Sequence, residues 1–443
     1  MTLEDNALED KYSEQGRLRT PIGKRVFDCF GFGFFFMVIW FAGVIVPLYP
    51  FIMGFDGFSL YWNFNYSDKS SSIDYAVLLY VLALVFVLMG CWLGRKTHLN
   101  FPVRVRYIVS SRIFSQRSTI FTLMALLAFA AILIILGGVW GLLYGASDRI
   151  RAFAGLNGLF LLQNLFLSVS LAWFIRLTGS KKRTLSERFC FWLYFFSGLF
   201  ICALQGQKST IFIIVLAMIV VRHYRVKRVN LIKGAVLGGV MFVSLMAYHL
   251  FKQEFLVAGK FFFINEEQGV FLSFIHFLAT QFTGNLMQLQ TMTVLVDAMP
   301  ERLEWQNGTT LLMLVLILIP SGLFPDKPLT AAGVFTEAFW PDKWLLQGTT
   351  MPPGIFGELY MNFGTLGVLF GGFFLGLIGG RLYGAVIYNP QSDRALGLYA
   401  LAVASLLHLF RGELASVALL IASILIPFLF LSSKRDEPVN NPI

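Results

Sequence analysis

The sequence predicts an all-α, multi-pass membrane protein with about 10–12 transmembrane helices. Two observations predict this fold class. Of the 443 residues, 57% are hydrophobic and only 14% are charged, which lies outside the composition of soluble globular domains. The apolar residues also gather in runs close to the length of about 20 residues that a membrane-spanning helix needs.

Ten apolar runs, separated mostly by short basic connectors, are the candidate spans. They cover residues 27–51, 75–93, 119–143, 155–175, 190–204, 209–221, 231–250, 365–386, 395–410 and 413–432. Two further runs, 268–296 and 309–320, are ambiguous between a pair of spans and shallow re-entrant elements. Either choice leaves the orientation of the later helices unchanged.

The distribution of charge between the runs predicts the orientation. The connector 94–118 holds six basic residues and no acid, whereas the segment 54–74 offers three aspartates against one lysine. Because cytoplasmic connectors carry the excess of Lys and Arg, both termini are expected in the cytoplasm. The expected parts are a cytoplasmic segment 1–26, helices one to seven in 27–250, an external insert 251–364, C-terminal helices 365–432 and a cytoplasmic tail 433–443.

Composition and motifs exclude several classes of function. The net charge of +10 follows the connectors, so we expect no nucleic-acid binding. The four cysteines lie in or beside apolar runs without metal-ligand or disulfide spacing. The chain has no glycine-rich nucleotide motif and no zinc motif, so we expect neither a cofactor nor a metal. The polar N-terminal segment has no apolar core of a cleaved signal peptide.

Two basic residues are expected at the outer ends of helices. Lys208 lies in QGQKS before an arm of about 13 residues, which is roughly 20 Å of helix against a hydrocarbon core of about 30 Å. The tip should therefore be sunk below the outer surface, where a cation marks a functional site or snorkels to the interface. Arg411 lies in HLFRGE, with His408 three residues earlier on the same helical face and Glu413 after a glycine.

The polar stretch 320–364 offers further candidates. Lys327 follows the turn of FPDKP, and Glu358 and Asn362 are four residues apart in GELYMN. Tyr360 lies between them on a different face. Glu358 has an alternative role as a first-turn acid that the helix dipole favours.

The predicted topology gathers five cations on the outer side of the membrane. Arg149 and Arg151 in ASDRIRAF break the positive-inside pattern, although pairing with Asp148 would also explain them. A multiply charged anion at the outer leaflet, such as a lipid diphosphate, is the natural ligand for such a group. The five cations are Arg149, Arg151, Lys208, Lys327 and Arg411.

Three segments resemble the O-antigen polymerase class, the oligosaccharide repeat-unit polymerases of Wzy type. They are GQKSTIFIIVLA, an Ile-Pro followed by LFPDKP and then GELYMNFGTLG, and LFRGE before the last helix. The similarity covers about the last half of the chain. It departs from the family at Lys208 and at Ser321, where relatives often have arginine.

The resemblance implies a GT-C-like glycosyltransferase at the outer face of the bacterial inner membrane. Its substrates would be undecaprenyl-diphosphate-linked oligosaccharides, and its partners a chain-length-determining copolymerase and a flippase. Lys208, Lys327 and Arg411 would stabilise the diphosphate. The base would be Glu413, His408 or Glu358, and Arg149, Arg151, Tyr360 and Asn362 would contact substrate.

Two other functions remain open at this stage. An O-antigen ligase would use the same donor and a different acceptor. A flippase for lipid-linked oligosaccharides would belong to another class, whose members tend to show internal repeats and charges near the middle of the membrane. The chain shows no such repeat, and its candidate charges gather at the outer end.

Overall fold

The computed structural model describes residues 28–48, 70–97, 111–145, 153, 156–179, 184–205, 207–230, 286–317, 319, 324, 326–347, 350–389 and 392–431, with isolated positions between 232 and 247. Every regular element in these residues is helical. Seven of the described helices are long and apolar enough to cross a membrane. The protein is therefore an all-helical, multi-pass membrane protein over the part that the structure describes.

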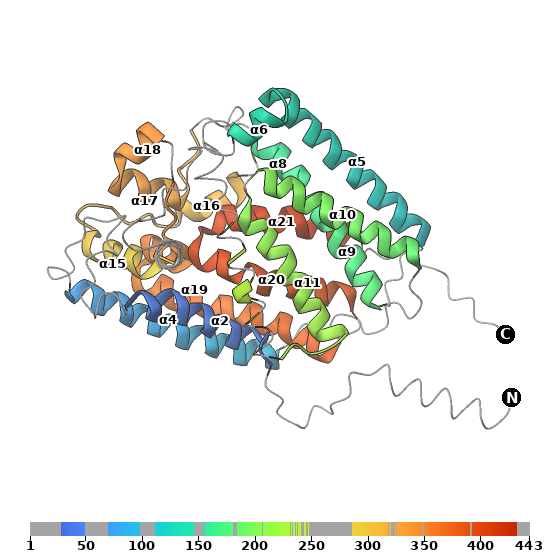
Figure 1. The fold of residues 1–443 in the computed structure, drawn as a ribbon. Helices are drawn as coiled ribbons and strands as arrows, with labels where there is room; N and C mark the ends of the chain where they lie inside the picture. Colours follow the sequence, from blue (N-terminus) through green and yellow to red (C-terminus); the bar gives the residue numbers. More distant parts are fainter. Residues whose placement is uncertain are drawn as a thin grey trace, which may run out of the picture.

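The helices follow one another along the chain as labelled in Figure 1. The first half contains α2 (Phe32–Trp40), the π-helical turn η1 (Phe41–Ile45), α4 (Ser70–Lys96), α5 (Ser111–Leu136), α6 (Val139–Gly145), α8 (Asn157–Gln163), α9 (Leu165–Gly179), α10 (Leu185–Leu204) and α11 (Lys208–Arg225). The second half contains α15 (Gln288–Ala298), α16 (Thr309–Leu316), α17 (Ala331–Phe339), α18 (Pro341–Gln347), α19 (Gly354–Tyr388), α20 (Asp393–Arg411) and α21 (Leu414–Leu431).

Local sequence signals set several of these boundaries. Thr184 and Glu187 form a capping box at the start of α10, and Ser392 caps α20. Gly137 and Gly138 both have positive φ, so the predicted run 119–143 is divided between α5 and α6. The predicted run 231–250 lies largely outside the described residues.

The ambiguous part of the insert consists of short helices where the structure describes it. α15 has 11 residues and α16 has 8, both shorter than the roughly 20 residues of a span. Residues 268–285 lie outside the described part. In Figure 1, α15, α17 and α18 gather at one end of the bundle, where α19 also begins.

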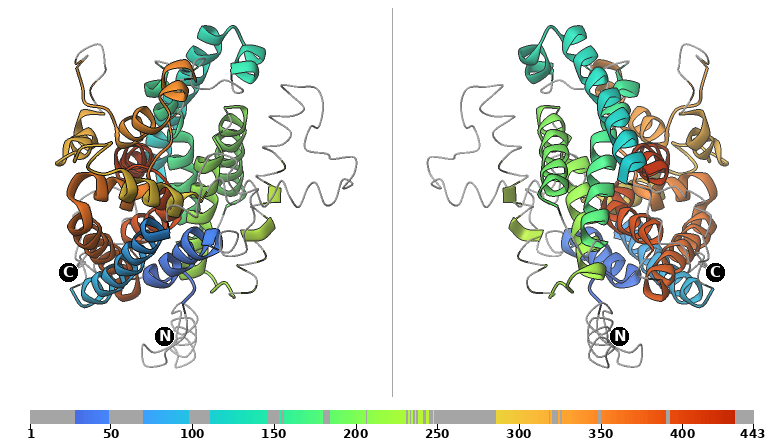
Figure 2. Two further views of the ribbon diagram at one scale, coloured as in Figure 1. Left: turned by 90° about the vertical axis from the view of Figure 1, so that its left-hand side faces the viewer. Right: turned by 90° about the vertical axis from the view of Figure 1, so that its right-hand side faces the viewer.

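Helices α4 and α19 pack along each other more extensively than any other pair. Glycines at the contact allow the two backbones to touch: a Cβ at Gly376 would lie 2.0 Å from the Val87 carbonyl oxygen, and one at Gly90 would lie 2.1 Å from the Phe373 carbonyl oxygen. Small residues four apart are a common device for close helix packing in membranes. This pair forms one edge of the bundle, and α10 and α11 lie on its opposite side (Figure 2).

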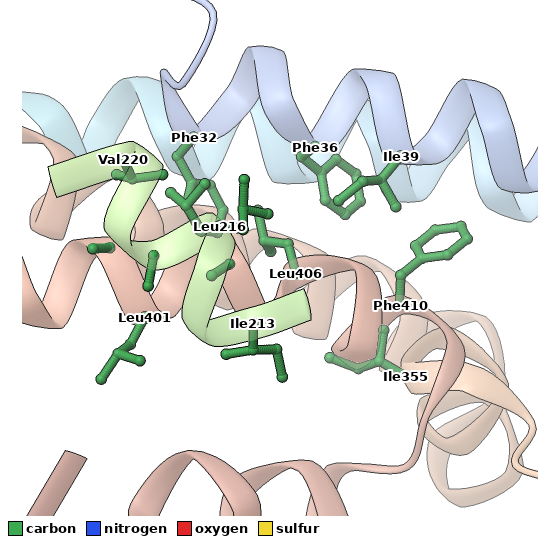
Figure 3. Packing of buried hydrophobic residues seen from close by; sticks show 14 of the residues in the cluster. Phe32, Phe36, Ile39, Ile213, Leu216, Val220, Ile355, Leu401, Leu406 and Phe410 are labelled. Carbon is green, nitrogen blue, oxygen red and sulfur yellow. The ribbon is translucent and has the colours of Figure 1, made fainter. Parts of the chain in front are cut away.

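An aromatic cluster joins four helices near the start of α19 and the end of α20. The rings of Phe36, Tyr80, Phe356 and Phe410 come from α2, α4, α19 and α20, with centroids 5.9–6.2 Å apart. Figure 3 shows Phe36 and Phe410 directed toward each other with aliphatic side chains between the helices. Because aromatic pairs of this geometry add to apolar burial, the cluster fixes the start of α19 beside the end of α20.

Candidate functional site

The candidate site lies at the break between α20 and α21. Helix α20 ends at Arg411, Gly412 is extended, and Glu413 precedes the first residue of α21. The Gly412 N–H donates to the His408 carbonyl oxygen at 2.8 Å. A Cβ at Gly412 would lie 2.7 Å from that same oxygen, so the break requires glycine.

Arg411 and His408 are half-buried at this break. Among the residues that the structure describes, none hydrogen-bonds or forms an ion pair with the guanidinium of Arg411 or the ring of His408. A cation in the last turn of a helix is favoured by the helix dipole, which accounts for part of its stability there. A guanidinium offers five N–H donors, and within the described residues none of those of Arg411 has a partner.

Glu413 connects the break between α20 and α21 to helix α17 by a hydrogen bond. Its side chain is buried at 5% exposure, and its Oε2 accepts the Ala332 N–H at 2.7 Å while Oε1 accepts the hydroxyl of Ser416. Ala332 lies in the first turn of α17, where Thr330 also caps the helix. A carboxylate at this position satisfies an otherwise unpaired N–H group and interacts favourably with the helix dipole.

Glu358 acts in the same way on the other side of the break. It is fully buried; its Oε2 accepts the N–H of Leu414, the first residue of α21, at 2.6 Å, and its Oε1 accepts the Thr310 hydroxyl at 3.2 Å. In both glutamates each carboxyl oxygen accepts a hydrogen bond. Neither carboxylate is directed to Arg411 by any hydrogen bond among the described residues.

Asn362 extends the hydrogen bonds of Glu358 into the insert. Its Nδ2 donates to Thr310 Oγ1 and to the Glu358 carbonyl oxygen, both at 2.7 Å, and its Oδ1 accepts the Gly308 N–H at 2.8 Å. The two hydrogen bonds therefore form a chain in which Asn362 donates to Thr310 and Thr310 donates to Glu358. Thr310 is absent from the residues predicted from the sequence, where its only signal is a threonine after an Asn-Gly turn.

Tyr360 and Lys327 have partners within the insert. The Tyr360 ring is buried and lies 5.6 Å, centroid to centroid, from the Trp305 ring. Lys327 donates from Nζ to the carbonyl oxygen of Ile319 at 2.6 Å, just beyond the C-terminal end of α16. This hydrogen bond joins Lys327 to the segment that follows α16.

The remaining predicted cations are described only in part. Lys208 is the first residue of α11, but its side chain lies outside the described residues, as do Arg149 and Arg151. The turn before Lys208 is held by amides: Gln207 Nε2 donates to Gln205 Oε1 at 2.9 Å, and Gln205 in turn donates to Gln163. Gln205 is 1% exposed.

The structure thus brings together His408, Arg411, Glu413 and Glu358 at one break. It connects Asn362 to them through Thr310 and gives Lys327 and Tyr360 partners elsewhere in the insert. No known family model, curated protein or solved structure matches the chain.

A metal could be held, by composition, at a different place. Ligand atoms of Asp28, Cys29 and His223 lie within 4.8 Å of one another, near the ends of α11 and α19 that face away from the insert. The oxygens of Asp28 are already engaged: Oδ2 accepts from Tyr224 at 2.8 Å and from Tyr383 at 2.9 Å, and Oδ1 accepts the Phe30 N–H.

The protonation of His223 does not suit a metal ligand. His223 Nδ1 accepts the Val229 N–H at 3.0 Å, so its proton is carried on Nε2, which faces Asp28 Oδ1 at 3.2 Å. A protonated ring nitrogen cannot bind a metal. Burial raises the pKa of Asp28, but His223 and the two tyrosine hydroxyls outweigh burial and hold the pKa below its usual value. The cluster fits an ionised anchor for the segment before α2.

Proposed function

We propose that the protein is a membrane glycosyltransferase that polymerises undecaprenyl-diphosphate-linked repeat units at the outer face of the bacterial inner membrane. The repeat units would belong to an O-antigen, a capsule or an exopolysaccharide. The resemblance of LFPDKP, GELYMNFG and LFRGE to repeat-unit polymerases suggests the reaction. The α20–α21 break supplies the chemical argument.

One observation carries the proposal. Arg411 lies two residues before the buried Glu413, and the carboxylates of Glu413 and Glu358 hydrogen-bond to backbone N–H groups of α17 and α21. The positive charge is therefore left without a counter-ion among the described residues. Arginine binds phosphate oxygens in a bidentate manner, so a diphosphate presented at the outer leaflet would complete this arrangement.

The proposed reaction is a glycosyl transfer with a diphosphate leaving group. The hydroxyl oxygen of the acceptor sugar bonds to the anomeric carbon of the donor glycan, and the bond from that carbon to the diphosphate oxygen breaks. The departing electron pair stays on undecaprenyl diphosphate, which Arg411 stabilises, with Lys208 as the second cation. The hydroxyl proton passes to a base on the protein.

His408 is the base that the geometry supports best. The oxygens of Glu358 and Glu413 are engaged with backbone and hydroxyl donors, whereas His408 has no hydrogen-bond partner for its ring among the described residues. It lies one helical turn before Arg411, so both groups can reach one substrate. A neutral imidazole accepts a proton near neutral pH.

The test is the length of the surface glycan in a host that lacks its own copy of the gene. Arg411→Ala should leave protein abundance similar and reduce the glycan to a single repeat unit, since the loss of one such electrostatic contact costs about 10²–10³ in rate. His408→Gln should lower the rate by about 10²–10⁴-fold. Arg302→Ala is the matched control, because Arg302 is exposed and donates to the Ala338 carbonyl of the same insert.

The outcomes separate the competing functions. Normal chain lengths with Arg411→Ala would refute the proposal. Loss of even the single repeat unit would indicate a ligase or a flippase, because a polymerase defect still leaves one unit attached to the lipid acceptor.

A further inference from the structure

A cavity of about 710 Å³ lies along the outward-facing side of α19. Four large apolar residues form its ridge. The last three are four residues apart, which places them on one helical face, and the first precedes the interruption of the helix at Gly364. All four are well exposed, at 49–63%, so the cavity opens sideways from the helix. They are Phe363, Leu366, Phe370 and Phe374.

Glycines next to the ridge allow Leu359, which also lines the cavity, to pack closely: a Cβ at Gly371 would lie 2.4 Å from its side chain. Gly364, Gly367 and Gly371 line it at the adjacent position around the helix. From Gly364 to Phe374 the cavity follows ten residues, roughly 15 Å at the rise of an α-helix. A slot that follows one helix axis accommodates one extended chain more readily than two.

The cavity has to be filled by hydrocarbon when the protein is in a membrane. α19 is one of the seven helices long and apolar enough to cross the bilayer, and the ridge contributes no polar group. Ordered water needs two to four polar partners, which the apolar part of this cavity lacks. An apolar chain from the membrane is the occupant that the lining suits.

The end of the cavity nearest the insert is polar. Trp305, Asn307 and Asn362 line it there, beside the kink at Gly364, whose φ of 60° interrupts the helix. Asn362 is also the first donor in the hydrogen-bond chain through Thr310 to Glu358. The cavity therefore begins where the hydrogen bonds of the candidate site end, and continues along the exposed apolar side of α19.

We propose that this cavity holds the isoprenoid chain of the lipid-linked substrate, with its polar end toward Asn362. The identity of the chain rests on the proposed function; the cavity supplies the position and the single-chain form. An amphiphile placed in this way has its head beside the insert and its tail along α19. A phospholipid would have to leave its second acyl chain outside the slot.

The test is photocrosslinking of the full-length protein in nanodiscs that contain undecaprenyl phosphate in phosphatidylglycerol. A benzophenone amino acid replaces Phe370 in one variant and Ile378 in the other. Ile378 is a matched control, because it lies on the same helix, is 58% exposed like Phe370, and does not line the cavity. Mass spectrometry identifies the lipid attached to each variant.

Position 370 should give about tenfold more polyprenyl adduct than position 378, relative to phospholipid adduct, for a preference of about 1.4 kcal/mol. Leu366→Trp, introduced beside the photoreactive position 370, should abolish this preference by filling the cavity, and Ile378→Trp should not. Equal polyprenyl adducts at both positions, or phospholipid adducts alone at 370, would overturn the inference.

The two proposals fail in different ways. If Leu366→Trp leaves a normal polymer and position 370 shows no polyprenyl preference, the cavity is not the chain site and the polymerase proposal stands. If position 370 shows the preference while Arg411→Ala leaves chain length unchanged, the chain site stands and the polymerase proposal falls.

Discussion

Replacing each buried glutamate at the break by glutamine separates an anchoring carboxylate from a catalytic one. Glutamine keeps the size of glutamate and removes the charge, but it offers one acceptor oxygen and one donor group. Both glutamates use two acceptor oxygens. The two substitutions differ because the partners of Glu358 and Glu413 differ in their freedom to reorient.

Glu358→Gln should be the more damaging substitution. The amide oxygen has to accept the Leu414 N–H, so the amide NH₂ faces Thr310, whose oxygen already accepts from Asn362. The Thr310 proton then has no acceptor, and Thr310 is 1% exposed. One buried donor without a partner costs about 1–3 kcal/mol, and the lost charge at the start of α21 costs about 0.3–1 kcal/mol more.

Glu413→Gln should cost only the smaller, electrostatic part. Its amide oxygen can accept the Ala332 N–H while the NH₂ donates to Ser416, and Ser416 is exposed, so its own proton can reach another acceptor. We expect a loss of about 0.3–1 kcal/mol. The two variants should therefore differ by about 1–3 kcal/mol in the free energy of unfolding.

Thermal unfolding in detergent, followed by intrinsic fluorescence, ranks the two variants against the parent. Glu358→Gln should melt below both Glu413→Gln and the parent. Glycan polymerisation should fall only in proportion to the folded protein. A Glu413→Gln that is as unstable as Glu358→Gln would refute the directional argument, and either variant with normal melting and no polymer would identify that glutamate as the base.

Two further predictions concern the bundle itself. Gly376→Ala places a Cβ 2.0 Å from the Val87 carbonyl oxygen and should destabilise the packing of α4 against α19 by about 1–3 kcal/mol, which a reduced yield of folded protein would show. Gly158→Ala is the control, because a Cβ at Gly158 meets open space, and it should leave the yield unchanged. Equal yields for the two variants would contradict the close contact. Asp28→Asn should destabilise the protein at neutral pH, because the ionised carboxylate that Tyr224 stabilises is then lost. The destabilisation should disappear as the pH falls through the folded-state pKa of Asp28, which lies below 3.8. A stability difference between variant and parent that is independent of pH would refute this role.

The membrane-spanning helices could be predicted from the sequence because each is long enough to give its own signal. The predicted run 75–93 lies within α4, 365–386 within α19, and 395–410 within α20. The break inside 119–143 was missed, although Gly137-Gly138 is visible in the sequence. Apolar composition reports burial in lipid and does not distinguish one straight helix from two joined by a turn.

The partners of the polar residues could not be predicted in the same way. The sequence suggested Glu358, Asn362 and Glu413 as candidates, and the structure places them near the break. It could not show that Thr310 connects two of them, or that Glu413 reaches the start of α17, because these contacts join residues 48–81 positions apart. Hydrogen-bond partners at such separations depend on tertiary packing, which residue spacing along one helix does not report.

The use of both glutamates as helix anchors bears directly on how Arg411 can act. A glutamate paired with Arg411 would neutralise it, and an incoming diphosphate would have to displace that carboxylate. Instead each acid is held by a backbone N–H group, so the negative charges stabilise helix starts and the guanidinium keeps its donors. The aromatic cluster around Phe410, the residue before Arg411, prevents the break from rearranging easily. Preorganised charge of this kind would favour the anion that develops in the proposed reaction. Gly412, whose Cβ would lie 2.7 Å from the His408 carbonyl oxygen, permits the close turn that holds Arg411 in this position.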